Sequence, residues 1–84
     1  FLMIIKYFAW LKNITNTEEE IINDLKINDI VKLKKFLSKK YPKLKKYFQD
    51  QEMIQIAINL KYTRENKKIK SKDEVALFPP VSGG

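Results

Sequence analysis

Val75-Ala-Leu-Phe-Pro-Pro-Val-Ser-Gly-Gly84 is the last stretch of the sequence, and none of its residues carries a charged side chain. This is unusual in a chain in which 32% of the residues are charged. The apolar run from Val75 to Phe78 is typical of a strand, and Pro79-Pro80 ends it because proline has no N–H to donate to a ladder. We therefore expect a folded domain over residues 1–78 and a projecting segment over residues 79–84.

The chemistry of this segment is concentrated at its end. Gly83 and Gly84 have no Cβ, so their backbone can pass through a slot that larger residues would block. In an extended, polyproline-like conformation residues 79–84 would reach roughly 20 Å. The reactive group is the α-carboxylate of Gly84, which becomes an acyl donor only after activation, for example as an acyl-adenylate. A bare Gly-Gly end would also suit a flexible terminus or a cloning remnant, but Pro79-Pro80 and the preceding strand argue against both.

Length and composition restrict the class of protein. The 84 residues suffice for one small domain, and no run of about 18 apolar residues predicts a membrane span. Lys6 interrupts the apolar start and no small-residue cleavage site follows, so we expect no signal peptide and a cytoplasmic location, with Met3 as a candidate natural start.

The sequence contains no cysteine and no histidine. This removes the thiolate nucleophile, the usual general base and the commonest metal ligands. We therefore expect neither a metal site nor an autonomous enzyme. If the protein handles sulfur, a C-terminal thiocarboxylate is the carrier chemistry that remains.

The basic residues are clustered. The net charge is +7, every basic residue except Arg64 is lysine, and eight lysines fall between Lys32 and Lys46 with no acid among them. Lysines at such spacing most often form the solvated face of a helix. Contact with an acidic partner protein and binding of nucleic acid are the alternatives. Nucleic acid is the weaker one, because arginine is the usual reader of bases.

The most clearly predicted element is a helix. Asp29 is a good N-cap, with Asn28 as a rival, and Pro42 ends the helix near Lys40. One helical face is lined by apolar residues that recur at three to four positions, namely Ile30, Leu33, Leu37 and Tyr41.

Two strands are predicted before the helix. The first covers Ile4 to Leu11, with Trp10 packing at its end, and the polar residues Asn13 to Thr17 form a turn. The second covers residues 22–27. A short helix starting with a capping box of Thr17 and Glu20 is the alternative for this region.

The region after the helix is predicted to contain three more strands. Leu44, Tyr47 and Phe48 suggest a short turn under the core, residues 53–60 a third strand, and Ile69 the centre of a brief fourth strand. Residues 62–68 form a polar turn region, and the last strand covers Glu74 to Phe78.

The expected order is therefore β-β-α-β-β-β, an α+β fold. One helix can cover one face of a mixed sheet of about five strands, with the two most apolar strands, the first and the last, at its centre. This arrangement is the β-grasp, or ubiquitin-like, fold.

The final run, Asp73-Glu-Val-Ala-Leu-Phe-Pro-Pro-Val-Ser-Gly-Gly84, resembles the C-terminal signature of the molybdopterin synthase small subunit family, MoaD, which belongs with ThiS to the ubiquitin-like sulfur carriers. Other segments are similar to that family in the same order along the chain, and they are Met3 to Ala9, Leu33, Leu37, Pro42 and Ala57 to Asn59. One departure is Lys72, which stands where the family usually has glycine and leaves the type of that turn open.

The resemblance implies a function and partners. An E1-like adenylyltransferase would use ATP to adenylate Gly84, and a sulfur donor enzyme would convert it to a thiocarboxylate. The tail, Pro79, Pro80, Val81, Ser82 and Gly83, would enter the large subunit of molybdopterin synthase, and sulfur would pass to the cyclic pyranopterin precursor in molybdenum cofactor biosynthesis.

The same resemblance implies an interface and a division of labour. Phe8, Tyr62 and Phe78 correspond to apolar positions that contact the partner, although Phe8 and Phe78 would suit the core equally well. The chain would be a non-catalytic, sulfur-donating subunit of a heterotetramer, without a tightly bound cofactor. A ThiS-like carrier for thiazole synthesis and a ubiquitin-like protein modifier are the alternatives.

Overall fold

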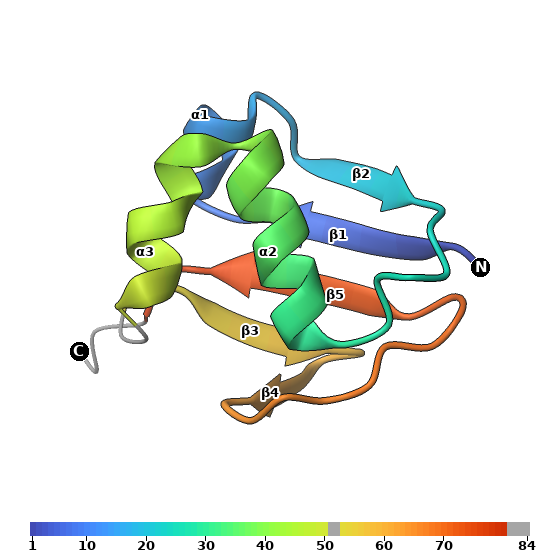
Figure 1. The fold of residues 1–84 in the computed structure, drawn as a ribbon. Coiled ribbons are helices and arrows are strands. Elements are labelled where there is room, and N and C mark those ends of the chain that lie inside the picture. Colours follow the sequence, from blue (N-terminus) through green and yellow to red (C-terminus); the bar gives the residue numbers. More distant parts are fainter. Residues whose placement is uncertain (51–52, 81–84) are drawn as a thin grey trace.

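Five strands form one mixed sheet in residues 1–50 and 53–80, the parts of the chain that the computed structural model describes (Figure 1). The α2 helix crosses one face of this sheet, and α3 lies at the end toward which β5 points (Figure 1). The predicted α+β, β-grasp architecture is confirmed. The elements are β1 (Met3–Tyr7), α1 (Leu11–Thr15), β2 (Glu19–Ile22), α2 (Ile30–Lys40), the 3-10 helix η1 (Pro42–Leu44), α3 (Lys45–Gln49), β3 (Gln55–Ile58), β4 (Lys61–Thr63) and β5 (Glu74–Phe78).

The last strand of the chain lies in the middle of the sheet. The strand order is β2-β1-β5-β3-β4, so β5 has a hydrogen-bonded neighbour on each edge. It runs parallel to β1, with Ile5 opposite Val75, and antiparallel to β3, with Ile56 opposite Leu77. The two outer pairs, β1–β2 and β3–β4, are antiparallel. The prediction that the first and last strands are central is confirmed.

The core lies between the sheet and α2. Alternate residues of the central strands point toward the helix, because successive strand residues face opposite sides of a sheet. These inward residues are Met3, Ile5, Tyr7, Val75 and Leu77, and none is more than 2% exposed. The helix contributes Ile30, Leu33 and Leu37, the predicted apolar face, while Tyr41 is half-buried.

The ends of α2 agree with the prediction. Asp29 has an extended backbone, and its Oδ1 accepts a hydrogen bond from the N–H of Lys32 at 2.8 Å, as an N-cap should. The helix ends at Lys40, and the Tyr41 N–H donates to the Leu37 carbonyl before Pro42 starts η1. No helix among the described residues is long and apolar enough to cross a membrane.

A polar cluster ties β1 and β2 to the end of α2. Glu20 accepts hydrogen bonds from the hydroxyls of Tyr7 and Tyr41, the latter at 3.0 Å, and pairs with the Lys40 ammonium at 2.6 Å. Burial alone would raise the pKa of Glu20, but the bonds from Lys40 and the two tyrosines outweigh it and hold that pKa below its usual value. Burial and Glu20 together raise the pKa of Tyr7.

The first strand is shorter than predicted. It ends at Tyr7, not Leu11, because Ala9 has a left-handed backbone (φ 54°) that turns the chain into α1. Leu11 is fully buried in that helix, and Asn13, predicted to start a turn, belongs to it as well. Trp10 packs against Tyr47, with ring centroids 4.8 Å apart.

The second strand is present but lies earlier than predicted. It covers Glu19–Ile22 instead of residues 22–27 and pairs with β1, so the helical alternative is wrong. Only Ile22 of this strand is buried. It is an edge strand whose inward positions hold Glu20 and Ile22, while Ile21 is exposed, so it lacks the alternation of polar and apolar residues that marks a strand.

The prediction for the region after α2 is partly wrong. Leu44 is buried in η1 and Phe48 lies on α3, which agrees with the predicted short turn under the core. The third strand, β3, is shorter than the predicted residues 53–60. The fourth strand is Lys61–Thr63, which overlaps the start of the region 62–68 that was predicted as a turn. Ile69 is only 3% exposed but lies outside any strand, and its N–H donates to the Asn28 carbonyl.

Candidate functional site

The chain leaves the sheet at Phe78, the last residue of β5. Pro79 is half-buried and Pro80 is exposed, and neither belongs to a helix or strand. Val81, Ser82, Gly83 and the predicted reactive residue Gly84 lie outside the described residues. The described part of the site is therefore the surface around the point of exit.

Three aromatic residues surround this exit. Phe8 follows β1, and its N–H donates to the Leu77 carbonyl at 3.0 Å, which extends the parallel pairing by one residue. Tyr62 lies on β4, and its ring meets that of Phe78 edge-on, with centroids 5.4 Å apart. The sequence had singled out these three residues, and the fold brings them to one face. We call Phe8, Tyr62 and Phe78 the aromatic patch.

Strand alternation explains why the aromatic patch is not part of the core. Tyr7 and Leu77 point inward and are almost fully buried, so Phe8 and Phe78, which follow them, point to the face away from α2. Phe8 is 47% and Tyr62 70% exposed, and Phe78 is half-buried. The alternative that Phe8 and Phe78 fill the core is therefore wrong.

Two alanines give the rings room. Ala57 of β3 lies opposite Ala76 of β5 on one side and opposite Tyr62 of β4 on the other. Their small side chains let the rings of Tyr62 and Phe78 approach each other across β3. Ala57 was noted in the sequence only for a family resemblance, and Ala76 only as part of the last strand. Each alanine occupies an outward position of an otherwise apolar strand, and its importance follows only from the register of the three strands.

The same face becomes polar away from the aromatic patch. Lys6 of β1 and Glu74 of β5 form an ion pair with an N–O distance of 3.3 Å, and each side chain is 37% exposed. Beyond them lies the turn that leads into β5. An apolar area beside the exit of the chain, with a charged border, is the arrangement found in protein–protein interfaces.

The turn before β5 holds the strand in register. Lys72 has a left-handed backbone (φ 74°), the conformation that glycine adopts most easily, so the turn is of a type that favours glycine at this position. The Asn59 side chain donates to Asp73 and accepts from the Glu74 N–H, both at 2.9 Å. Asn59 thus anchors the start of β5 to the β3–β4 hairpin, a role that the sequence analysis missed.

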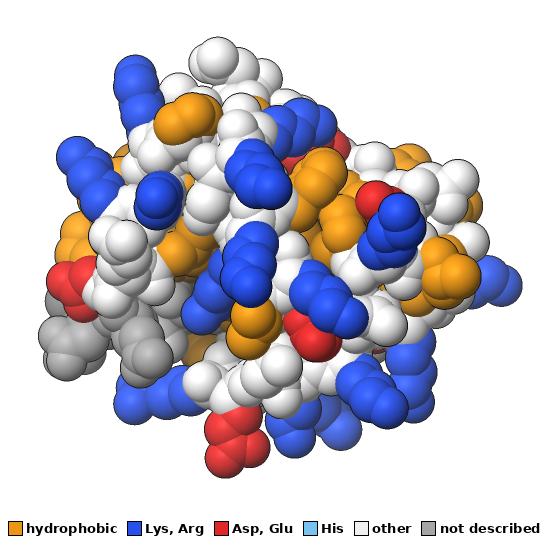
Figure 2. Space-filling view, in the orientation of Figure 1, with side chains coloured by type: hydrophobic (Ala, Val, Ile, Leu, Met, Phe, Trp, Pro, Cys, Tyr) orange, Lys and Arg blue, Asp and Glu red, His pale blue; other side chains and the backbone are white. Residues whose placement is uncertain are grey.

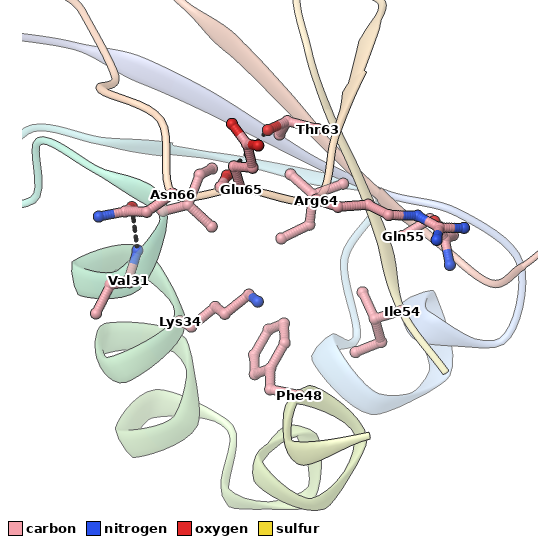
Figure 3. A pocket seen from close by; sticks show the side chains of 11 residues that line it. Val31, Lys34, Phe48, Ile54, Gln55, Thr63, Arg64, Glu65 and Asn66 are labelled. Atoms are coloured by element: carbon pink, nitrogen blue, oxygen red, sulfur yellow. Dashed lines mark hydrogen bonds between the residues drawn. The ribbon is translucent and has the colours of Figure 1, made fainter. Parts of the chain in front are cut away.

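A separate hollow lies on the helical layer, between α2, α3, β3 and the segment after β4 (Figure 3). Its volume is about 370 Å³, and the side chains of Lys34 and Phe48 point into it. At its edge, Asn66 Oδ1 accepts a hydrogen bond from the Val31 N–H at 3.1 Å, which satisfies one of the free N–H groups at the start of α2. This hollow and the aromatic patch are on different faces of the sheet.

The described residues contain no group of three or more acidic, histidine or cysteine side chains placed to hold a metal ion. What the exit surface offers is apolar contact area next to Pro79 and Pro80. Such a surface can dock a partner and direct the end of the chain into it. Fold and site together define a ubiquitin-like β-grasp domain in which the chain leaves the central strand beside the aromatic patch.

The particular family follows from comparison with known proteins. The model of the ThiS family matches residues 5–84, so the chain belongs to the ThiS family. This makes it a sulfur carrier of the ThiS/MoaD type.

Solved structures agree over nearly the whole chain. A protein provisionally assigned as molybdopterin converting factor subunit 1 of Pyrococcus furiosus is 28% identical, with a TM-score of 0.82 and coverage of 95% of this chain and 98% of that one. Small archaeal modifier protein 1 of Methanosarcina acetivorans is 28% identical, with a TM-score of 0.76 and coverage of 99% and 96%. A chain from the complex of subunits 1 and 2 of the Helicobacter pylori molybdopterin-converting factor is 26% identical, with a TM-score of 0.72 and full coverage of both.

Proposed function

We propose that this protein is the small, sulfur-donating subunit of molybdopterin synthase. The observation that carries the proposal is the aromatic patch beside the point where Pro79-Pro80 leaves the central strand. The similarity to a chain from a complex of two molybdopterin-converting factor subunits supports a large-subunit partner. The family supports sulfur-carrier chemistry at the end of the chain.

The proposed reaction begins at the Gly84 carboxylate. A carboxylate oxygen attacks the α-phosphorus of ATP on an E1-like enzyme, pyrophosphate leaves, and an acyl-adenylate forms. Sulfur from a donor enzyme then attacks the acyl carbon and AMP leaves. After the bond between sulfur and the donor is broken reductively by a thiol, Gly84 ends in a thiocarboxylate. The folded domain supplies none of these reacting groups, and its role is to position the terminus.

In the second stage the loaded terminus enters the large subunit. Its thiocarboxylate sulfur attacks a carbon of the cyclic pyranopterin precursor and displaces the oxygen substituent bound there, which leaves with its electron pair. Water then hydrolyses the acyl–sulfur bond, which leaves the sulfur on the pterin and regenerates the Gly84 carboxylate. Two such transfers would supply both sulfur atoms of the dithiolene. The aromatic patch would hold the folded domain at a fixed place on the large subunit and so set how far the terminal segment reaches into it. Without that docking, the position of Gly84 in the large subunit would be undefined.

The direct test is mass spectrometry after incubation with an E1-like enzyme, ATP and a sulfur source. We expect a gain of about 16 Da, the exchange of one oxygen for sulfur. A variant that lacks Gly84 should show no gain while its circular dichroism spectrum stays native. If the full-length chain gains no mass with an enzyme that loads a known carrier, the proposal is wrong.

A second candidate function is protein modification. It is favoured by the similarity to small archaeal modifier protein 1 of Methanosarcina acetivorans and of Haloferax volcanii. In that case Gly84 would form an isopeptide bond with lysine amines, and high-molecular-weight conjugates would survive on a denaturing gel. A ThiS-like role in thiazole synthesis would instead show as sulfur transfer to a thiazole-forming enzyme and not to a pterin.

A further inference from the structure

The helical layer carries a second hollow that adjoins the one in Figure 3. It lies between α2 and α3, has a volume of about 410 Å³ and is lined on both sides by lysines, namely Lys34, Lys35, Lys39 and Lys45. Lys34 and Phe48 line both hollows, so the two meet at these residues. Arg64 lines the far end of the first hollow. We call this continuous depression the cationic trough.

The positive charge of the cationic trough is uncompensated within the described residues. None of its four lysines, nor Arg64, takes part in an ion pair with another described residue, and Glu65 is the one acid among the described lining residues. Lys35 and Lys39 are four residues apart on α2, a spacing at which like charges repel each other and weaken the helix. Figure 2, which views this layer, shows basic side chains spread across it with hydrophobic atoms exposed between them.

The floor of the cationic trough is apolar at its centre. Phe48 is half-buried, and its ring is accessible from both hollows. Each hollow is close to the small end of the range of volumes that hold a ligand group, about 300–1,000 Å³. The site therefore has room for an extended segment with one apolar side chain over Phe48.

We propose that the cationic trough binds an acidic peptide segment of a partner protein. Asp or Glu side chains of that segment would face Lys34, Lys35, Lys39 and Lys45, and an apolar side chain between them would lie on Phe48. Binding would relieve the repulsion between Lys35 and Lys39, which gives a physical reason for a cluster that otherwise weakens the helix.

The geometry favours a peptide over nucleic acid. A nucleic-acid site needs a track of charges along a phosphate backbone and usually arginine at the bases. Here the single arginine, Arg64, stands at one end, and the lysines converge on a hollow with an aromatic floor. Lysine is a compact point charge that suits single carboxylates as well as phosphates.

This surface is separate from the one used in the proposed function. The cationic trough lies on the helical layer, whereas the aromatic patch lies on the face of the sheet turned away from α2. A partner in the cationic trough would need no contact with Phe8 or Tyr62 of the aromatic patch. The chain could therefore hold two partners at once, for example a delivery partner on the helices and a modifying enzyme at the tail.

Fluorescence anisotropy with a labelled synthetic peptide rich in Asp and Glu, with one central leucine, tests the proposal on the full chain. We expect saturable binding that weakens as salt is raised. The combined change Lys35→Glu, Lys39→Glu and Lys45→Glu should weaken binding by about tenfold or more. The control Lys61→Glu, Lys67→Glu and Lys70→Glu alters the net charge equally outside the cationic trough and should change affinity by less than about threefold.

Two further comparisons make the outcome decisive. A peptide with serine in place of leucine should bind more weakly if Phe48 receives the apolar side chain. A single-stranded DNA of equal charge should bind more weakly than the leucine peptide at the same salt concentration. Absence of peptide binding, equal losses in the two triple variants, or tighter binding of DNA would each overturn the proposal. If the Glu variant loses its native circular dichroism spectrum, the Gln changes at the same three positions replace it. No activating enzyme is involved, so the result is independent of sulfur loading.

Discussion

Removing one exposed ring should weaken the proposed complex far more than it destabilises the fold. Tyr62 is 70% exposed on an edge strand. An aromatic side chain buries roughly 150–250 Å² in total, so on the order of 100–175 Å² of Tyr62 is still available to a partner. At about 25 cal/mol per Å² this area corresponds to about 3–4 kcal/mol as an upper limit. After the cost of ordering the interface we expect Tyr62→Ala to weaken binding by about 2 kcal/mol, or roughly 30-fold in Kd.

The cost to the isolated domain should be smaller. Within the chain, Tyr62 loses mainly its edge-on contact with Phe78, and such pairs contribute about 0.5–1.5 kcal/mol. Isothermal titration calorimetry with the large subunit from the same organism gives the change in Kd. Urea unfolding of the free chain gives the change in the free energy of unfolding.

Leu60→Ala is the matched control. Leu60 lies on the same hairpin and is even more exposed, at 90%, but it is at the tip beside the start of β5, away from the aromatic patch. We expect its removal to leave Kd unchanged within about twofold, as is usual for residues outside a hot spot. If both substitutions weaken binding equally, or if Tyr62→Ala has no effect on a folded protein, the aromatic patch is not the docking surface.

Three further substitutions test the fold that aims the tail. Glu20→Gln should lower the free energy of unfolding by about 1–3 kcal/mol, because it removes a charge-assisted bond to Lys40. Folding lowers the pKa of Glu20, so its charged side chain stabilises the fold fully above the pKa of an unfolded glutamate. This stabilisation is lost as the pH falls through the pKa of Glu20 in the folded protein. The free energies of unfolding of the wild type and of Glu20→Gln should therefore converge at low pH. Lys72→Gly should raise the free energy of unfolding by up to about 1 kcal/mol, because glycine adopts the observed φ of 74° without strain; a fall in melting temperature would contradict this. Asp29→Ala should lower the free energy of unfolding by about 1 kcal/mol and reduce the helical circular dichroism signal. Asp29→Asn should keep most of both, because the asparagine oxygen can also accept the Lys32 N–H.

The parts of the fold that could be predicted are those with strong local signals. The α2 helix was delimited from the sequence because Asp29 caps it and Pro42 forbids its continuation. The last strand was delimited by charged and proline residues on its two sides, and its central place followed from its apolar composition. The three residues of the aromatic patch were predicted from a family resemblance. In the structure, the register of β1, β5 and β3 brings them together.

The parts that were missed depend on tertiary contacts or on unusual turns. The apolar run through Leu11 looks like one strand, and only the left-handed Ala9 divides it into β1 and α1. The β3–β4 hairpin has Asn59 and Leu60 at φ 50° and 69°, where a turn of this kind normally has glycine. Without that signal a short polar strand such as β4 cannot be distinguished from a loop. The cationic trough depends on how α3 packs beside α2, which no local pattern specifies.

The central place of β5 also has a mechanical consequence. The terminal segment is the continuation of a strand that is hydrogen-bonded to β1 along one edge and to β3 along the other. In the proposed function an enzyme would bind the terminus, and a pull on Pro80 along β5 would load both rows of hydrogen bonds in shear, so that they would have to break together. A terminus attached to an edge strand could be peeled away one bond at a time. In the proposed cycles of loading and delivery, the partner would therefore pull on the strand that the sheet holds along both edges.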